Sequence, residues 1–116
     1  MKKQEYHITI LEKGGKKTDK TVKGYIYKCG KYFFGVTGER YEWRITELAT
    51  GMYTGVSVKK LDDVGDGIID FLQRIGAKQL DYIIEQGRHF IIDYDYSKSN
   101  YTEILTTNAV WNSIYR

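Results

Sequence analysis

Polar and apolar residues alternate along much of the first half of the chain, with the period of two that is typical of β-strands. Residues 5–11 alternate in this way, and the polar, glycine-containing stretch 13–20 follows as a predicted loop. Further on, Cys29–Gly30 and Gly38–Glu39 predict two-residue hairpin turns, because glycine adopts the backbone angles that such turns require. The pattern therefore predicts consecutive strands that pair antiparallel as a meander.

The predicted turns decide which side chains share a face of the sheet, since successive side chains of a strand point to opposite sides. One face carries an apolar row, in which the expected cross-strand pairs are Tyr27 with Tyr32, Tyr25 with Phe34, Phe34 with Trp43, Tyr32 with Ile45, and Val36 with Tyr41. A slip of one residue would exchange the two faces, so burial of this row should maintain the register. We expect most of the other face to be open to water, and it carries Ile26, Lys28, Lys31, Phe33, Glu42, Arg44 and Thr46.

A fifth strand extends the predicted sheet. Residues 48–51 form a four-residue loop, and the strand follows over about 52–60. With this loop length Val56 lies beside Trp43, on the apolar face of the sheet.

Helical periodicity replaces alternation in the next segment. From Asp62 to Ile75 the apolar residues recur at helical spacing, acids occupy the first turns, and Gly76 stands where a C-cap belongs. We expect this helix to cover the apolar face of the sheet. Because Gly65 and Gly67 weaken its beginning, we expect it to start nearer Asp66.

The remainder of the chain predicts a second helix over 77–86 and a sixth strand over 88–96. In the tail, 102–107 is rich in β-branched residues, whereas 108–116 suits a short helix. The fold we predict is a single α+β domain spanning 1–116. It consists of an antiparallel meander of about five strands, one or two helices packed on its aromatic face, and a C-terminal strand or helix element.

Composition agrees with one globular domain and indicates a compartment. The 116 residues are 41% hydrophobic and 28% charged, which suffices for a core without disulfides or a structural metal. The single cysteine, Cys29, falls in a predicted tight turn, where an exposed free thiol would suit a reducing environment. The first residues lack the continuous apolar region of a signal peptide, and no apolar run is long enough to span a bilayer. We therefore expect a cytoplasmic protein.

Charge is divided unevenly along the chain. Residues 1–60 hold 13 Lys and Arg against 6 Asp and Glu, a net +7, whereas residues 61–116 hold 5 against 9, a net −4. The first half therefore predicts a basic surface that can meet either phosphates or an acidic protein surface.

The two histidines suggest one catalytic alternative. His7-Ile8-Thr9 resembles one of the paired His-x-Thr strand motifs of the 2H phosphoesterase family. The resemblance implies that two imidazoles act as acid and base while the hydroxyls hold the phosphate. His89 would supply the second imidazole, but no hydroxyl residue stands two positions after it.

Candidate metal-binding patterns are incomplete. Asp62 and Asp66 match two ligand positions of a calcium loop, but Gln73 stands where the bidentate carboxylate belongs. Asp93 and Asp95 alternate as a nuclease pair would, without the accompanying E-x-K pattern. We therefore predict no catalytic residue, no metal site and no cofactor.

The basic surface is the remaining functional candidate. We expect a non-enzymatic binding module for a protein partner, such as a phage or mobile-element inhibitor of a host nucleic-acid enzyme, in the manner of an anti-CRISPR protein. Direct DNA or RNA binding and 2H-like catalysis by His7 and His89 are the alternatives. The predicted partner-binding residues are Lys16, Lys17, Lys28, Lys31, Phe33, Arg44 and Tyr53.

Overall fold

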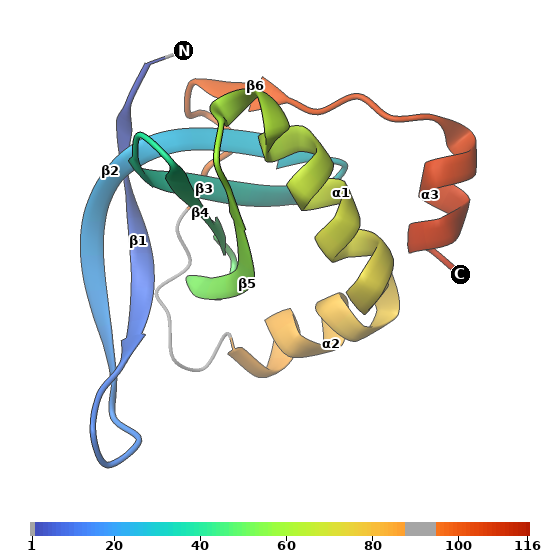
Figure 1. Ribbon diagram of the computed structural model, residues 1–116. Helices are drawn as coiled ribbons and strands as arrows, with labels where there is room; N and C mark the ends of the chain where they lie inside the picture. The colour runs from blue at the N-terminus through green and yellow to red at the C-terminus, as the bar shows by residue number, and fades with distance from the viewer. Residues whose placement is uncertain (1, 88–94) are drawn as a thin grey trace.

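The computed structural model describes residues 2–87 and 95–116, and within them a curved β-sheet lies beside helices gathered on one side (Figure 1). The elements in chain order are β1 (Gln4–Leu11), β2 (Lys17–Cys29), β3 (Tyr32–Glu39), β4 (Glu42–Glu47), β5 (Met52–Val58), the 3₁₀ turn η1 (Leu61–Asp63), α1 (Val64–Ile75), α2 (Ala77–Gly87), β6 (Tyr101–Glu103) and α3 (Asn108–Ile114). The predicted α+β class, with a five-stranded antiparallel meander and helical cover, is confirmed.

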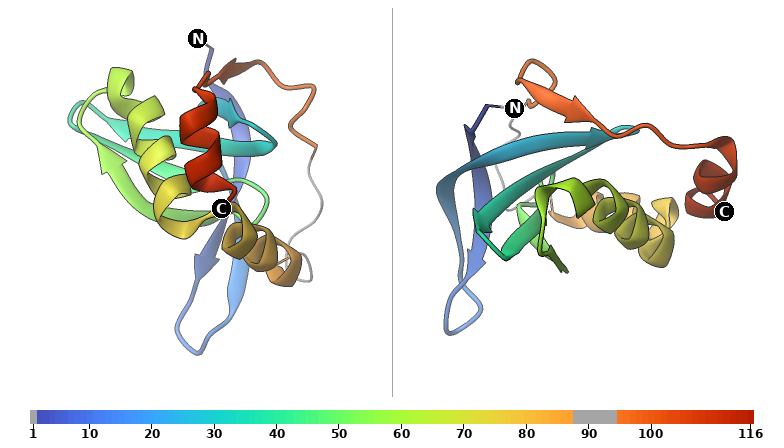
Figure 2. Two further views of the ribbon diagram at one scale, coloured as in Figure 1. Left: turned by 90° about the vertical axis from the view of Figure 1, so that its right-hand side faces the viewer. Right: turned by 45° about the horizontal axis from the view of Figure 1, so that its top comes forward.

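The strands follow the order β1-β2-β3-β4-β5, each antiparallel to its neighbour. β2 is 13 residues long and serves two partners, because residues 17–24 pair with β1 and residues 25–29 pair with β3. The β1–β2 part forms a hairpin whose tip extends beyond the rest of the molecule (Figures 1 and 2). The predicted loop 13–20 was therefore too long, since its second half belongs to β2.

The first strand and the C-terminal segment, by which we mean residues 95–103, meet along β2. β1 leaves the edge of β2 at Gln4, which pairs with Gly24, and β6 takes over that edge in parallel from Ile26. The Gln4 side chain joins the two elements, because its amide donates to the Asn100 carbonyl and its oxygen accepts from the Asn100 N–H at 2.9 Å. The C-terminal segment is thus anchored to the first strand.

The predicted apolar face forms the main hydrophobic core, beneath α1 and α3. Fully buried side chains of the sheet meet Val64, Ile68 and Leu72 of α1. Burial of the apolar row is confirmed for Tyr27, Tyr32, Phe34, Val36 and Ile45, with Tyr25 and Trp43 packed at the margin.

The first predicted turn is placed one position too early. Gly30 and Lys31 form the turn, and Gly30 takes a positive φ of 61°. Tyr27 consequently pairs with Phe34 rather than with Tyr32.

The second predicted turn is also too early in the chain. Arg40 and Tyr41 form it, so Val36 pairs with Ile45, and Tyr41 is 79% exposed instead of lying in the apolar row. In both hairpins the partners move by an even number of residues, so the side chains that stay in strands keep their predicted faces.

The loop at 48–51 is confirmed, and it leads into β5. A register shift between Arg44 and Thr46 places Val58, rather than Val56, opposite Trp43. Residues 54–56 of β5 lie opposite the single Ile45 of β4, and the two extra residues locally bend the ladder.

We had expected the other face of the sheet to be open to water. It is covered instead, because β1 curls over it. Tyr6, Ile26 and Leu48 form a second buried cluster there. The ring of Tyr6 lies directly on Gly35, where a Cβ atom would come within 2.5 Å of it. Thr46 on the same face is also buried.

Helix α1 starts at Val64, two residues before the predicted Asp66. Gly67 faces the sheet, and a Cβ atom at this position would lie only 3.0 Å from Ile45 and 3.1 Å from Val58. This glycine lets the helix approach the sheet closely. Gly76, with a φ of 78°, ends the helix as predicted, and its N–H donates to the Leu72 carbonyl.

The second helix is confirmed as α2, and the tail contains both β6 and α3. Of the predicted sixth strand, residues 88–94 lie outside the described residues, and Asp95 and Tyr96 are not in a strand. The α3 helix packs on α1, and the Gln73 amide donates to the Ser113 hydroxyl at 3.0 Å.

Cys29 is buried, not exposed as predicted. Because the turn begins at Gly30, Cys29 is the last residue of β2 and points into the main core. Burial raises the pKa of its thiol to about 11. Because the thiol is buried, Cys29 gives no indication of a reducing compartment.

Candidate partner-binding surface

Lys28 and Phe33, expected on an open basic face, are half-buried against the C-terminal segment. The Lys28 ammonium lies 5.7 Å from the Phe33 ring centroid and 5.6 Å from that of Tyr101. Tyr96 and Tyr101 also pack on Phe33, with centroid distances of 6.3 and 5.6 Å. The chain's own rings thus occupy the contacts that we had assigned to a partner.

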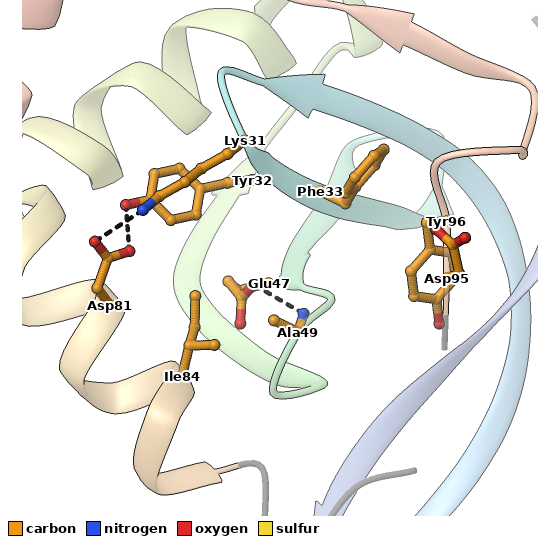
Figure 3. Close-up of a pocket in the computed structure, with 9 residues that line it drawn as sticks. All are labelled: Lys31, Tyr32, Phe33, Glu47, Ala49, Asp81, Ile84, Asp95 and Tyr96. Atoms are coloured by element: carbon orange, nitrogen blue, oxygen red, sulfur yellow. Dashed lines mark hydrogen bonds and ion pairs between the residues drawn. The ribbon is translucent and has the colours of Figure 1, made fainter. Parts of the chain in front are cut away.

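Lys31 is exposed, and its ammonium group forms an ion pair with Asp81 of α2 at 2.9 Å. The Tyr32 hydroxyl donates to the same carboxylate at 2.7 Å (Figure 3). Partial burial acts to raise the pKa of Asp81, but the hydrogen bonds from Tyr32 and Lys31 and the charge of Lys31 outweigh it and lower that pKa. Burial and the Asp81 carboxylate raise the pKa of Tyr32. These contacts fasten α2 to the β2–β3 turn.

A cavity of about 250 Å³ lies beside this ion pair. Figure 3 shows its lining, which comes from the β2–β3 turn, strands β3 and β4, the 48–51 loop, α2 and the segment after residue 94. The lining residues are Lys31, Tyr32, Phe33, Glu47, Ala49, Asp81, Ile84, Asp95 and Tyr96.

Glu47 is the one buried carboxylate among the described residues that line this cavity. Its oxygens accept hydrogen bonds from the N–H groups of Ala49 and Thr50 at 2.8 and 2.9 Å, and from the Thr50 hydroxyl at 2.8 Å. Burial raises its pKa although these hydrogen bonds act to lower it. The carboxylate therefore holds the 48–51 loop, and its acceptor positions are largely used within the chain.

The β1–β2 hairpin is the most basic exposed part of the described chain. We call its exposed lysines the basic hairpin: Lys13, Lys16, Lys17, Lys20 and Lys23. Its tip turns through Gly14 and Gly15, both with positive φ, and the Glu12 N–H donates to the Lys16 carbonyl at 2.7 Å. Within residues 2–87 and 95–116, Lys13, Lys16, Lys20 and Lys23 form no ion pair. Lys16 and Lys17, two of the predicted partner-binding residues, therefore lie on a projecting hairpin.

Arg44 and Tyr53, the remaining predicted residues, come together on neighbouring strands. The Arg44 guanidinium carbon lies 4.2 Å from the Tyr53 ring centroid, which is a close cation–π contact. Both side chains are exposed. The structure therefore presents a cation and an aromatic ring as one exposed unit.

An apolar groove runs between α2 and the start of β5, beside the basic hairpin. We define it by Met52, Tyr53, Tyr82 and Ile83, which are 39%, 42%, 61% and 37% exposed. One end is a hollow of about 340 Å³ that includes Lys17 of the basic hairpin. The other end is a hollow of about 190 Å³, and both hollows share Thr50, Met52 and Ile83. The groove and the basic hairpin therefore adjoin.

Sequence reasoning missed Met52, Tyr82 and Ile83. A signal was present in α2, whose apolar residues extend around the helix beyond the buried Ala77 and Leu80. An apolar sector wider than the core requires marks an exposed contact surface.

The residues of the catalytic alternative are only partly described. His7 lies 3.2 Å from the Asp19 carboxylate on the same hairpin face. The Thr9 hydroxyl donates to the Thr50 carbonyl at 2.8 Å, so the hydroxyl of the His-x-Thr motif bonds within the chain. His89 lies outside the described residues, as does Asp93, so these predictions stay untested.

No family model matches the chain, and no match was found among curated proteins or solved structures. Among the described residues, no helix is long and apolar enough to cross a membrane. In the same part of the chain, no three His, Cys, Asp or Glu side chains gather as a metal site would require. The geometry of the surface is thus the basis for assigning a function.

Proposed function

We propose that this protein is a non-catalytic binding module that recognises a protein partner through the basic hairpin and the Arg44–Tyr53 pair. The observation that carries the proposal is that exposed lysines adjoin exposed large apolar side chains. Lys17 borders the same hollow as Met52 and Tyr82. Charged rims around aromatic, Met and aliphatic side chains are typical of protein–protein interfaces.

Direct nucleic-acid binding is less well supported by this arrangement. Such binding requires cations that follow a phosphate backbone, together with exposed aromatic rings on which bases stack. The aromatic residues of β2 and β3 are instead covered by α1, β1 and the C-terminal segment. Two exposed rings, Tyr53 and Tyr82, do lie next to cations, but each shares its hollow with the aliphatic side chains Met52 and Ile83, which offer no stacking surface.

A basic binding surface constrains the partner to one with an acidic contact region. If the partner is the host nucleic-acid enzyme expected from the sequence, the contact lies outside its nucleic-acid channel, because such channels are themselves basic. Inhibition would then work through a remote surface of the enzyme.

The test is an affinity pull-down from a lysate of the source organism, divided into nuclease-treated and untreated halves. Wild-type protein is compared with the double variant Lys16→Glu/Lys17→Glu. We expect a protein that is retained after nuclease and recovered at least about tenfold less by the variant, because two attractive charges become repulsive. The matched control is Lys78→Glu/Lys98→Glu, which makes the same charge change at exposed positions outside the basic hairpin.

Two results contradict the proposal. Loss of all recovery after nuclease would show that nucleic acid is the ligand. Equal recovery by the hairpin variant and the control would show that the basic hairpin is not the contact.

A further inference from the structure

We infer that the apolar groove is the docking site for a short acidic segment of the partner that carries large apolar side chains. This inference rests on the proposed function and adds to it the chemistry of the ligand. Long-range attraction comes from the basic hairpin, whereas the groove supplies the contacts that hold the segment.

The apolar content of the groove is the first reason. Four large side chains from α2 and the start of β5 remain 37–61% exposed side by side, although the main core lies directly behind them. Phe71, Ile75 and Leu80 form the floor of the second hollow. A contiguous apolar surface of this kind on a soluble protein marks a contact site for another molecule.

The charges around the groove are the second reason, and they are basic. Lys17 borders one end, and Arg44 lies on the ring of Tyr53 along one side. Arg74 borders a further hollow that shares Thr54 with the groove, but its ion pair with Asp70 at 3.1 Å offsets its charge, so Lys17 and Arg44 make the rim basic. An occupant with acidic side chains flanking its apolar ones therefore matches the rim.

The acids of α2 do not border the groove. Neither Asp81 nor Glu85 lines either of its two hollows. Each is two residues from Ile83, so at about 100° per residue both leave the helix on the side opposite Ile83. Asp81 is moreover paired with Lys31. Glu47 borders the second hollow, but its buried carboxylate accepts hydrogen bonds from its own loop.

The experiment selects peptides from a library of random 12-residue sequences displayed on phage, against full-length wild-type protein at physiological salt. Recovered peptides are synthesised with a fluorescent label, and their affinities are measured by anisotropy. Two groove variants, Ile83→Glu and Met52→Glu, change side chains on opposite walls that are already partly exposed. Leu105→Glu is the matched control, because Leu105 is 84% exposed and lies outside the groove.

We expect the recovered peptides to be rich in Asp and Glu beside Leu, Ile, Phe or Trp. Their affinity should fall at least about tenfold for both groove variants and stay unchanged for Leu105→Glu, with circular dichroism confirming that each variant is folded. Peptides without acidic enrichment, peptides that bind the groove variants equally well, or no recovered peptide at all would overturn the inference. Self-association of the wild type that Ile83→Glu abolishes would also overturn it, because a second copy would then be the occupant.

Failure of this inference can be told apart from failure of the proposed function. If the nuclease-resistant partner is lost with Lys16→Glu/Lys17→Glu but retained by Ile83→Glu, the basic hairpin is the contact and the groove is not. If acidic peptides need the groove while no protein partner depends on the hairpin lysines, the groove binds and the proposed function is wrong.

Discussion

The contact between Tyr6 and Gly35 gives a sharp test of the second core, whose existence the sequence pattern did not reveal. A Cβ atom at Gly35 would lie 2.5, 2.6 and 2.8 Å from three ring carbons of Tyr6. Carbon atoms pack at about 3.5–4.0 Å, so Gly35→Ala requires the ring to move by about 1 Å in a closely packed site. Overpacking of this size lowers the free energy of unfolding by about 1–3 kcal/mol. Alanine offsets about 0.5–1 kcal/mol of this loss, because it has less backbone entropy than glycine to lose on folding.

A double-mutant cycle isolates that contact. Tyr6→Val alone should cost about 2–4 kcal/mol, because it leaves a cavity where a fully buried ring was. In the Tyr6→Val/Gly35→Ala variant the new methyl group no longer meets a ring. The double variant should therefore lose at least about 1 kcal/mol less free energy of unfolding than the sum of the two single losses. Urea unfolding gives each free energy of unfolding.

Gly24→Ala is the matched control for the cycle. A Cβ atom at Gly24 would lie 2.9 and 3.0 Å from Cε1 and the hydroxyl of Tyr6, but its closest contact, at 2.2 Å, is with the Val36 carbonyl oxygen, which belongs to the backbone and cannot be removed by changing Tyr6. Tyr6→Val should therefore rescue Gly35→Ala and leave most of the cost of Gly24→Ala. Additive costs for Tyr6 and Gly35 would refute the packing of β1 over this face.

Three other predictions concern single side chains. The buried Tyr6 hydroxyl has no hydrogen bond among the described residues, so Tyr6→Phe should be neutral or stabilising. Tyr32→Phe should instead lower the free energy of unfolding by about 1 kcal/mol, because it removes the hydrogen bond to Asp81. If urea unfolding shows an equally large loss for Tyr6→Phe, the prediction for Tyr6 is wrong. Burial raises the pKa of Cys29 to about 11, so iodoacetamide should label the native thiol far more slowly than the urea-unfolded one, and equal rates would disprove its burial. Because burial raises the pKa of Glu47 above its ordinary 4.5, the folded state binds this proton more tightly, and the stability from this group declines as pH rises through the folded pKa. The stability of Glu47→Gln minus that of wild type should therefore rise with pH above about 4.5, and a flat difference between pH 4 and 7 would be inconsistent with the raised pKa.

The sequence allowed the faces of the sheet to be predicted, but not its curvature. A two-residue turn that moves by one position shifts the cross-strand partners by two residues, so Tyr27 and Phe34 were assigned to the correct face although the turn is one position further along. The second core depends on β1 folding back over Gly35, a long-range contact that no local pattern encodes. For the same reason Gly67 was interpreted as a weakness of α1, whereas it lets the helix meet the sheet.

The candidate surface was predictable to the extent that it depends on exposed charge. Lys16, Lys17, Arg44 and Tyr53 are exposed as expected, because loops and polar strand positions remain at the surface. Lys28 and Phe33 were not recognised as contacts within the chain, since the tyrosines that cover them are more than 60 residues further along. The groove was missed because it joins α2 to β5 across the fold.

The most direct test of the account is the affinity of the purified, nuclease-resistant partner for wild type and for Lys16→Glu/Lys17→Glu, measured by calorimetry over a range of salt concentrations. Rim charges act through long-range attraction, which salt screens. We predict that the variant binds at least about tenfold more weakly at low salt, about 1.4 kcal/mol, and that the difference narrows as salt rises. Equal affinities of the two proteins at every salt concentration would contradict the claim that the basic hairpin recognises the partner.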